Sequence, residues 1–115
     1  MITTDEAPMI YLASPHYDPD EVVRELRYEQ AMKATARLLC EGKWVYSPIV
    51  HYHEIARKHG LPNGFSFWKE YDEHMLGLAE AMYVLRLEGW NTSRGIASEI
   101  GFATKNQIPI YYIDD

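Results

Sequence analysis

The sequence has 115 residues, of which 47% are hydrophobic and 24% charged, and its formal net charge is −6. This length suits one domain, residues 1–115, with a real hydrophobic core. The negative charge disfavours a nucleic-acid polymer as partner, because polymer binding depends on basic side chains that release counterions. No segment approaches the roughly 20 apolar residues of a membrane span. The acidic start MITTDEAP lacks the regions of a signal peptide, so we expect a cytoplasmic protein with no membrane partner.

Apolar runs and helical patterns alternate along the chain. Residues 9–13 (MIYLA) read as a buried strand, and the Asp-Pro-Asp-Glu sequence at 18–21 is typical of a helix start. Ser47-Pro48 is expected to stop a short strand, whose carboxyl end leads into residues 49–51. The expected elements are a strand at 9–13, a helix from about 19 to 41, a strand at 44–46, a helical turn at 53–59, a helix at 67–80, a strand at 81–87, a helix at 95–106 and a strand at 108–113.

This order of elements predicts the fold class. Strands that alternate with helices imply crossover connections and a parallel sheet covered on both faces. We therefore expect an α/β protein with a small, doubly wound, flavodoxin- or Rossmann-like sheet of about four strands in the order 2-1-3-4. The single Cys40 lies in an apolar helical run, where a buried thiol is expected rather than a nucleophile.

The segment 83–103, YVLRLEGWNTSRGIASEIGFA, is the expected centre of the function. It reads as a strand, a loop and a helix start, and ligands of open α/β sheets bind at the carboxyl ends of the strands. Neither a dinucleotide-binding glycine motif nor a phosphate-binding Walker loop is present, so no organic cofactor is implied. The histidines at 51, 53 and 59 lack the four-residue spacing of a zinc-binding helix, so no metal site is predicted.

Two carboxylates are candidates for catalysis. Glu99 follows the helix start, Asp72 lies in the preceding helix, and the strand ends bring Ser14, His51 and Ser93 towards the same crevice. Paired carboxylates are what glycosyl transfer requires, with one as nucleophile and one managing a proton. The helix N-terminus is expected to keep Glu99 ionised. Spacing alone leaves open the alternative that these are two surface acids on separate helices.

Three stretches carry a resemblance to a known family. They are Tyr11-Leu12-Ala13-Ser14, the D-x-x-x-L pattern of Asp72 to Leu76, and the run SRGIASEIGFA at 93–103. Together they resemble the nucleoside 2-deoxyribosyltransferase superfamily over nearly the whole chain. The resemblance is closest to the branch of deoxynucleoside 5′-monophosphate N-glycosidases and to small bacterial and phage relatives.

The resemblance implies a role for most of the candidate residues. It implies Glu99 as the nucleophile that forms a covalent glycosyl intermediate, Asp72 as its acidic partner, Tyr11 near the sugar, Ser14 with Ser93 and Gly95 as phosphate contacts, and His51 as a pocket histidine. Serine at position 93, where the transferases usually have aspartate, favours the monophosphate branch, because an aspartate would repel a phosphate. Trp90 and Trp68 either stack on the base or fill the core.

The sequence therefore favours an enzyme that cleaves or exchanges the N-glycosidic bond of a 2′-deoxynucleoside or nucleoside 5′-monophosphate. Two other classes stay open: a non-catalytic nucleotide-binding or sensing module, and an interaction protein with an aromatic surface. The related transferases continue into a fifth strand and a terminal segment that contributes to a neighbouring subunit's site. The cleft is thus expected to be completed in a homodimer or higher homo-oligomer.

Overall fold

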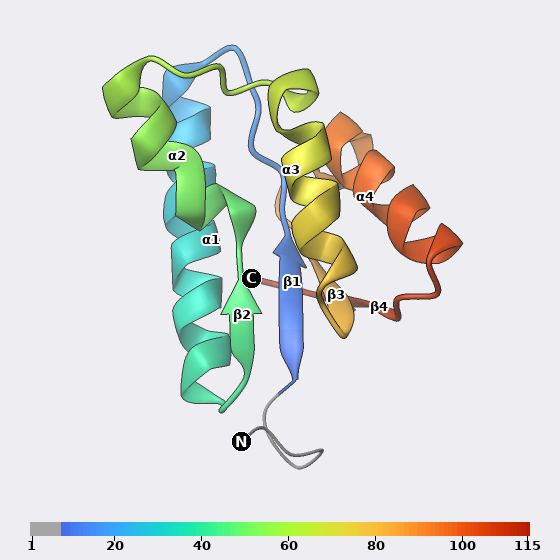
Figure 1. Ribbon diagram of the computed structural model, residues 1–115. Helices are drawn as coiled ribbons and strands as arrows, with labels where there is room; N and C mark the ends of the chain where they lie inside the picture. Colours follow the sequence, from blue (N-terminus) through green and yellow to red (C-terminus); the bar gives the residue numbers. More distant parts are fainter. Residues whose placement is uncertain (1–7) are drawn as a thin grey trace.

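The computed structural model describes residues 8–115 as one α/β domain (Figure 1). Its elements are β1 (Met9–Ala13), α1 (Glu21–Cys40), β2 (Trp44–Tyr46), α2 (Pro48–His59), α3 (Phe65–Gly77), β3 (Ala81–Leu85), a 3₁₀ turn (Trp90–Thr92), α4 (Arg94–Lys105) and β4 (Ile110–Ile113). Residues 1–7, on which the expectation about a signal peptide rests, lie outside the described part.

The four strands form one parallel sheet in the order β2-β1-β3-β4. Strand β1 is central: Tyr11 lies opposite Tyr46 of β2 and Met82 of β3. The predicted fold class, strand number and strand order are therefore confirmed. All four strands point the same way, so their carboxyl ends meet at one edge of the sheet.

Side chains that alternate along the strands form two separate cores. Tyr11 and Ala13 of β1 pack with Leu76 of α3 and with Ile96 and Ala103 of α4 on one face. On the other face, a second cluster joins the strands to α1; its buried members are Leu12, Ala34, Leu38, Leu85 and Leu87. Figure 1 shows α3 and α4 on the side of the sheet opposite α1. The prediction of helices on both faces is thus confirmed.

The start of α2 differs from the sequence-based prediction. Ser47 and Pro48 do stop β2, but they also begin a helix: the Ser47 Oγ accepts a hydrogen bond from the Val50 N–H at 3.2 Å, and Pro48 takes the first helical position. Proline suits that position because its missing N–H would have had no helical partner. Residues 49–51, expected at a strand end, are therefore in the first turn of α2, which ends at Gly60 in the left-handed conformation.

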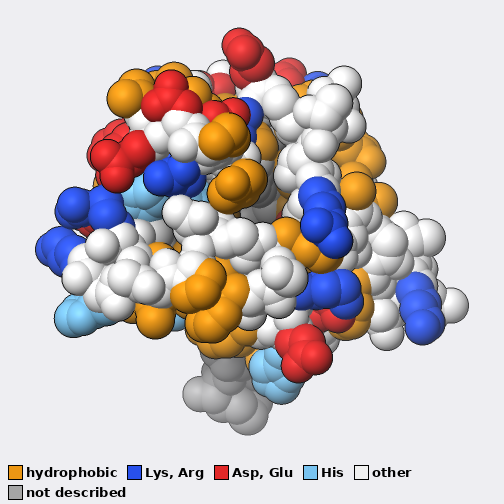
Figure 2. Space-filling view, turned by 90° about the horizontal axis from the view of Figure 1, so that it is seen from above, with side chains coloured by type: hydrophobic (Ala, Val, Ile, Leu, Met, Phe, Trp, Pro, Cys, Tyr) orange, Lys and Arg blue, Asp and Glu red, His pale blue; other side chains and the backbone are white. Residues whose placement is uncertain are grey.

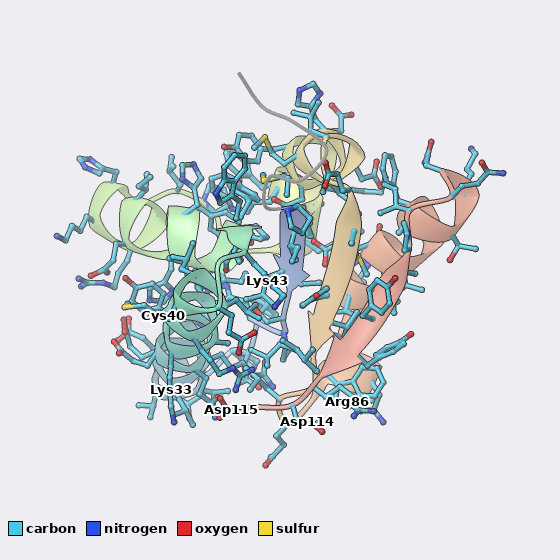
Figure 3. The ribbon with its side chains drawn as sticks, turned by 90° about the horizontal axis from the view of Figure 1, so that it is seen from below. Lys33, Cys40, Lys43, Arg86, Asp114 and Asp115 are labelled. Atoms are coloured by element: carbon cyan, nitrogen blue, oxygen red, sulfur yellow. The ribbon has the colours of Figure 1, made fainter. Side chains whose placement is uncertain are left out.

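The remaining differences are smaller. Helix α1 is capped by Asp20, which accepts a hydrogen bond from the Val22 N–H at 2.9 Å, and strand β3 ends at Leu85 rather than at residue 87. Cys40, expected to be buried, is exposed at the last residue of α1 (Figure 3). Beyond β3 and β4, Arg86 and Asp114 lie side by side in that view, with 3.0 Å between Nε and Oδ1. None of the described helices is long and apolar enough to cross a membrane.

Candidate active site

A cavity of about 610 Å³ opens among the β1–α1 loop, α2, α3 and the start of α4. Five of the predicted site residues line it: Ser14, Asp72, Ser93, Gly95 and Glu99. Figure 2 shows the end of the molecule towards which β1 points, where acidic, basic and apolar side chains are interspersed. The cavity volume falls within the range of small-molecule sites. We call this cavity the cleft.

Glu99 is a buried acid, with a side chain only 9% exposed. Burial raises the pKa of Glu99 from 4.5 to about 8, and the charges of Asp72 and Glu73 act in the same direction. A hydrogen bond from the Tyr11 hydroxyl to Glu99 Oε2 opposes this shift. The expectation that the helix N-terminus keeps Glu99 ionised is wrong for the unliganded cleft. Glu99 is the sixth residue of α4, beyond the first turn in which the helix dipole acts.

Asp72 is a second acid with an elevated pKa. It lies on α3 and lines the cleft together with Glu99. Burial raises the pKa of Asp72 from 3.8 to about 7, and its Oδ1 is buried with no hydrogen-bond partner among the residues that the structure describes. Two carboxyl groups in one cleft, both close to the point of ionisation at neutral pH, are a frequent property of catalytic sites.

Tyr11 is fully buried at the centre of the sheet and does not itself line the cleft. Its hydroxyl group holds Glu99, which comes from a segment 88 residues away. Burial and the neighbouring carboxylates raise the pKa of Tyr11 well above 10, so the hydroxyl stays a hydrogen-bond donor. Tyr11 therefore orients the candidate nucleophile.

Polar groups gather at two other parts of the cleft wall. Ser93 caps α4, where its Oγ accepts a hydrogen bond from the Ile96 N–H at 3.2 Å, and its own O–H remains able to donate. Ser14 is 7% exposed, and its Oγ has no hydrogen-bond partner within the described part of the chain. Arg94 at the start of α4 stacks on Phe65, with 4.6 Å from Cζ to the ring centroid.

Besides Tyr11, two other predicted site residues do not line the cleft. His51 lies in the first turn of α2 and pairs with the Tyr71 hydroxyl on α3 at 3.0 Å. Trp90, in the 3₁₀ turn, packs against the core beneath α3 and α4 and lies 5.7 Å from Tyr112 between ring centroids. Trp68, by contrast, lines the cleft and stacks on Tyr52 at 4.0 Å.

His16 and Arg27 are among the residues of the cleft wall that sequence reasoning missed. The guanidinium of Arg27 connects two loops: Nη1 donates to the Tyr17 carbonyl at 2.9 Å and Nη2 to the Glu88 carbonyl at 3.2 Å. Gly89, with φ +91°, leaves room for this contact, since a Cβ there would lie 2.5 Å from Arg27 Nη2. Because both acceptors are backbone atoms, no sequence motif points to Arg27.

One group of side chains has metal-like spacing. Glu25, His53 and Glu54 offer ligand atoms within 4.8 Å of one another. However, the Arg57 Nε donates to Glu54 at 2.6 Å and lies 3.8 Å from Glu25 Oε1. Arg57 thus already pairs with both carboxylates, and Glu25 also contacts His53, so the group has partners within the protein and does not require a metal ion.

Comparison with known proteins identifies a family but no activity. No curated protein matches the sequence. The model of the family DUF1937, described as a domain of unknown function, matches residues 8–115 and so covers every element of the fold. The chain therefore belongs to the DUF1937 family.

Proposed function

We propose that the protein cleaves or exchanges the N-glycosidic bond of a 2′-deoxynucleoside or a nucleoside 5′-monophosphate. The observation that carries this proposal is the pairing of Glu99 with Asp72 in one cleft, with Tyr11 holding Glu99 from behind. The sequence resemblance described above supports the same chemistry. The covalent intermediate would be a glycosyl ester of Glu99.

The chemistry divides into two displacements. In the first, the Glu99 carboxylate attacks C1′ of the sugar, the bond from C1′ to the base breaks, and Asp72 transfers its proton to the departing base. In the second, a water molecule attacks C1′ and gives its proton to Asp72, which releases Glu99 and the free sugar. A second base in place of water gives a transferase. Two displacements retain the configuration at C1′.

The ionisation of the two acids fits these roles when both are considered together. Attack requires ionised Glu99, and departure of the base requires protonated Asp72. With pKa values of about 8 and about 7, only a minority of molecules carries this arrangement at neutral pH. Positive charge that develops on the sugar in the transition state would stabilise ionised Glu99. The reaction would therefore proceed through the minority of molecules in which Glu99 is ionised and Asp72 is protonated.

The test is release of free base. The protein is incubated with the common 2′-deoxynucleosides and their 5′-monophosphates, and products are separated by chromatography. Wild-type protein should release base, Glu99→Gln should release none, and Glu70→Gln, which changes an exposed acid on α3, should behave as wild type. Mass spectrometry of quenched reactions should detect a sugar adduct on the peptide that contains Glu99. Binding without any turnover would select the non-catalytic alternative.

We also propose that the chain functions as a homo-oligomer in the cytoplasm. Strand β4 is at the edge of the sheet, and its Tyr111 and Tyr112 are 55% and 46% exposed. Paired edges of this kind are a common route to association between subunits. Sedimentation equilibrium should give a mass of at least twice 13.4 kDa. Replacing both tyrosines by lysine should yield a monomer.

A further inference from the structure

A chain of hydrogen bonds connects the outer surface of α1 to the wall of the cleft. Glu25 of α1 is 2.9 Å from His53 Nε2, and His53 Nδ1 is 2.8 Å from His16 Nε2. His53 of α2 and His16 of the β1–α1 loop are each only 6% exposed. The ring of His53 is stacked on Tyr28, with 4.2 Å between centroids. Both imidazoles are thus held by packing as well as by hydrogen bonds.

The order of donors and acceptors along this chain follows from its outer end. A carboxylate can only accept, so Glu25 requires a proton on His53 Nε2. With a single proton on the His53 ring, Nδ1 accepts from an N–H at Nε2 of His16. His16 is left with a bare Nδ1. The chain therefore selects one tautomer of His16, with a lone pair at its free end.

That free end has no partner among residues 8–115. The Nδ1 atom of His16 is buried and makes no hydrogen bond, although His16 lines the cleft. Burial lowers the pKa of His16 to about 3, and the neighbouring His53, Arg24 and Arg27 act in the same direction. The ring therefore stays neutral near pH 7 and cannot gain a second N–H. An acceptor held in this way is left for a ligand that donates.

We propose that His16 is a specificity residue whose Nδ1 accepts a hydrogen bond from a sugar hydroxyl of the ligand. Glu25 and His53 are positioning residues that hold His16 in the required tautomer. Ser14, two residues earlier in the same loop and also without a partner, completes a subsite for hydroxyl groups. The proposal rests on the proposed function for its choice of ligand, a nucleoside.

This subsite distinguishes between the two substrate classes that the proposed function includes. A free nucleoside can donate from its 5′-hydroxyl group, whereas a phosphate dianion presents only acceptors. Two facing acceptors repel each other, and a buried acceptor left unpaired is costly. The tautomer of His16 thus favours a nucleoside over its 5′-monophosphate.

The tautomer can be measured directly by ¹⁵N NMR of histidine-labelled full-length protein. Wild type should show His16 protonated at Nε2 and bare at Nδ1. Glu25→Gln should add the opposite tautomer, because an amide can donate as well as accept. Glu29→Gln, a change at an exposed position of the same helix, should leave the spectrum unchanged. A proton on Nδ1 of His16 in the wild type would overturn the proposal.

Ligand binding provides the second test. Each common 2′-deoxynucleoside and its 5′-monophosphate is titrated into wild type, His16→Gln and His16→Asn. At least one nucleoside should shift the Nδ1 resonance and bind about tenfold more tightly than its monophosphate. This preference should be lost in His16→Gln, whose amide mimics Nε2. It should be retained in part in His16→Asn, whose carbonyl oxygen mimics Nδ1.

Free base is measured in the same samples, so the two proposals fail separately. Binding with the expected preference but without base release overturns the enzymatic function and leaves the role of His16 intact. Base release with the same preference in wild type and His16→Gln overturns the role of His16 alone. The absence of any nucleoside-induced shift at Nδ1 also overturns it.

Discussion

Replacing the candidate nucleophile should stabilise the fold, and the gain should grow with pH. In the native state Glu99 has a pKa of about 8, compared with 4.5 for an ordinary glutamate. Unfolding above pH 4.5 therefore releases a proton. The native state has its full stability below this value and loses stability as pH rises through 8. Glutamine at position 99 cannot ionise, so Glu99→Gln escapes this loss.

The magnitude follows from the pKa difference. A difference of one pKa unit between the native and the unfolded state corresponds to about 1.4 kcal/mol of unfolding free energy. The stability advantage of Glu99→Gln over wild type should therefore widen by on the order of 3 kcal/mol between pH 5 and pH 8. For a domain of this size, that amounts to a Tm difference on the order of 10 °C. Asp72 also titrates in this range, and His16 does so in the unfolded state, but both residues are present in both proteins.

Urea unfolding followed by circular dichroism at pH 5, 6, 7 and 8 measures this change. Glu70→Gln serves as the matched control, because Glu70 is exposed on α3. The difference between pH values matters more than any single value, since the glutamine amide has its own hydrogen-bonding cost at every pH. A stability gap that stays constant or narrows as pH rises would refute the assignment of a buried, protonated Glu99.

Three further predictions concern activity and the loop contacts. A plot of kcat/KM for base release against pH should be bell-shaped, with its optimum between pH 7 and 8, because ionised Glu99 and protonated Asp72 are both required. A profile that only rises or only falls with pH would contradict the roles given to these two residues. Tyr11→Phe should move the falling limb of that profile to higher pH and lower its maximum, because the hydrogen bond that it removes lowers the pKa of Glu99, the higher of the two pKa values, and kinetics at a series of pH values detects the shift. In urea unfolding, Gly89→Ala should lower the free energy of unfolding by about 1 kcal/mol more than Gly42→Ala does. Both glycines have positive φ, but only a Cβ at position 89 meets Arg27. Equal losses of unfolding free energy in the two variants would show that the Arg27 contact contributes nothing.

The fold was accessible from the sequence because its signals are local. Apolar runs bounded by Ser-Pro or Gly give the strands, and their alternation with helices leaves few possible topologies. Ser47-Pro48 shows the limit of this reasoning. The same dipeptide ends a strand and begins a helix, and only the second role places His51 on α2 and away from the cleft.

The candidate site was predictable to a different degree for each residue. Glu99, Asp72 and Ser93 were found because they stand in recognisable stretches of the sequence. The ionisation state of Glu99 was not predictable from the sequence, because it depends on burial and on the charge of Asp72, which comes from another helix. The pairing of His16 with His53 joins a loop to a helix 37 residues away, and no local pattern contains it.

The contact of Arg27 with two loops has a consequence for how related sequences should vary. Arg27 binds the carbonyl oxygens of residues 17 and 88, and every amino acid supplies that atom. This contact therefore places no constraint on the side chains at these two positions among homologues. Residues 27 and 89 cannot vary independently, because a larger side chain at position 89 and the guanidinium at position 27 would occupy the same space. Family members that carry a larger residue than glycine at position 89 should therefore lack arginine at position 27.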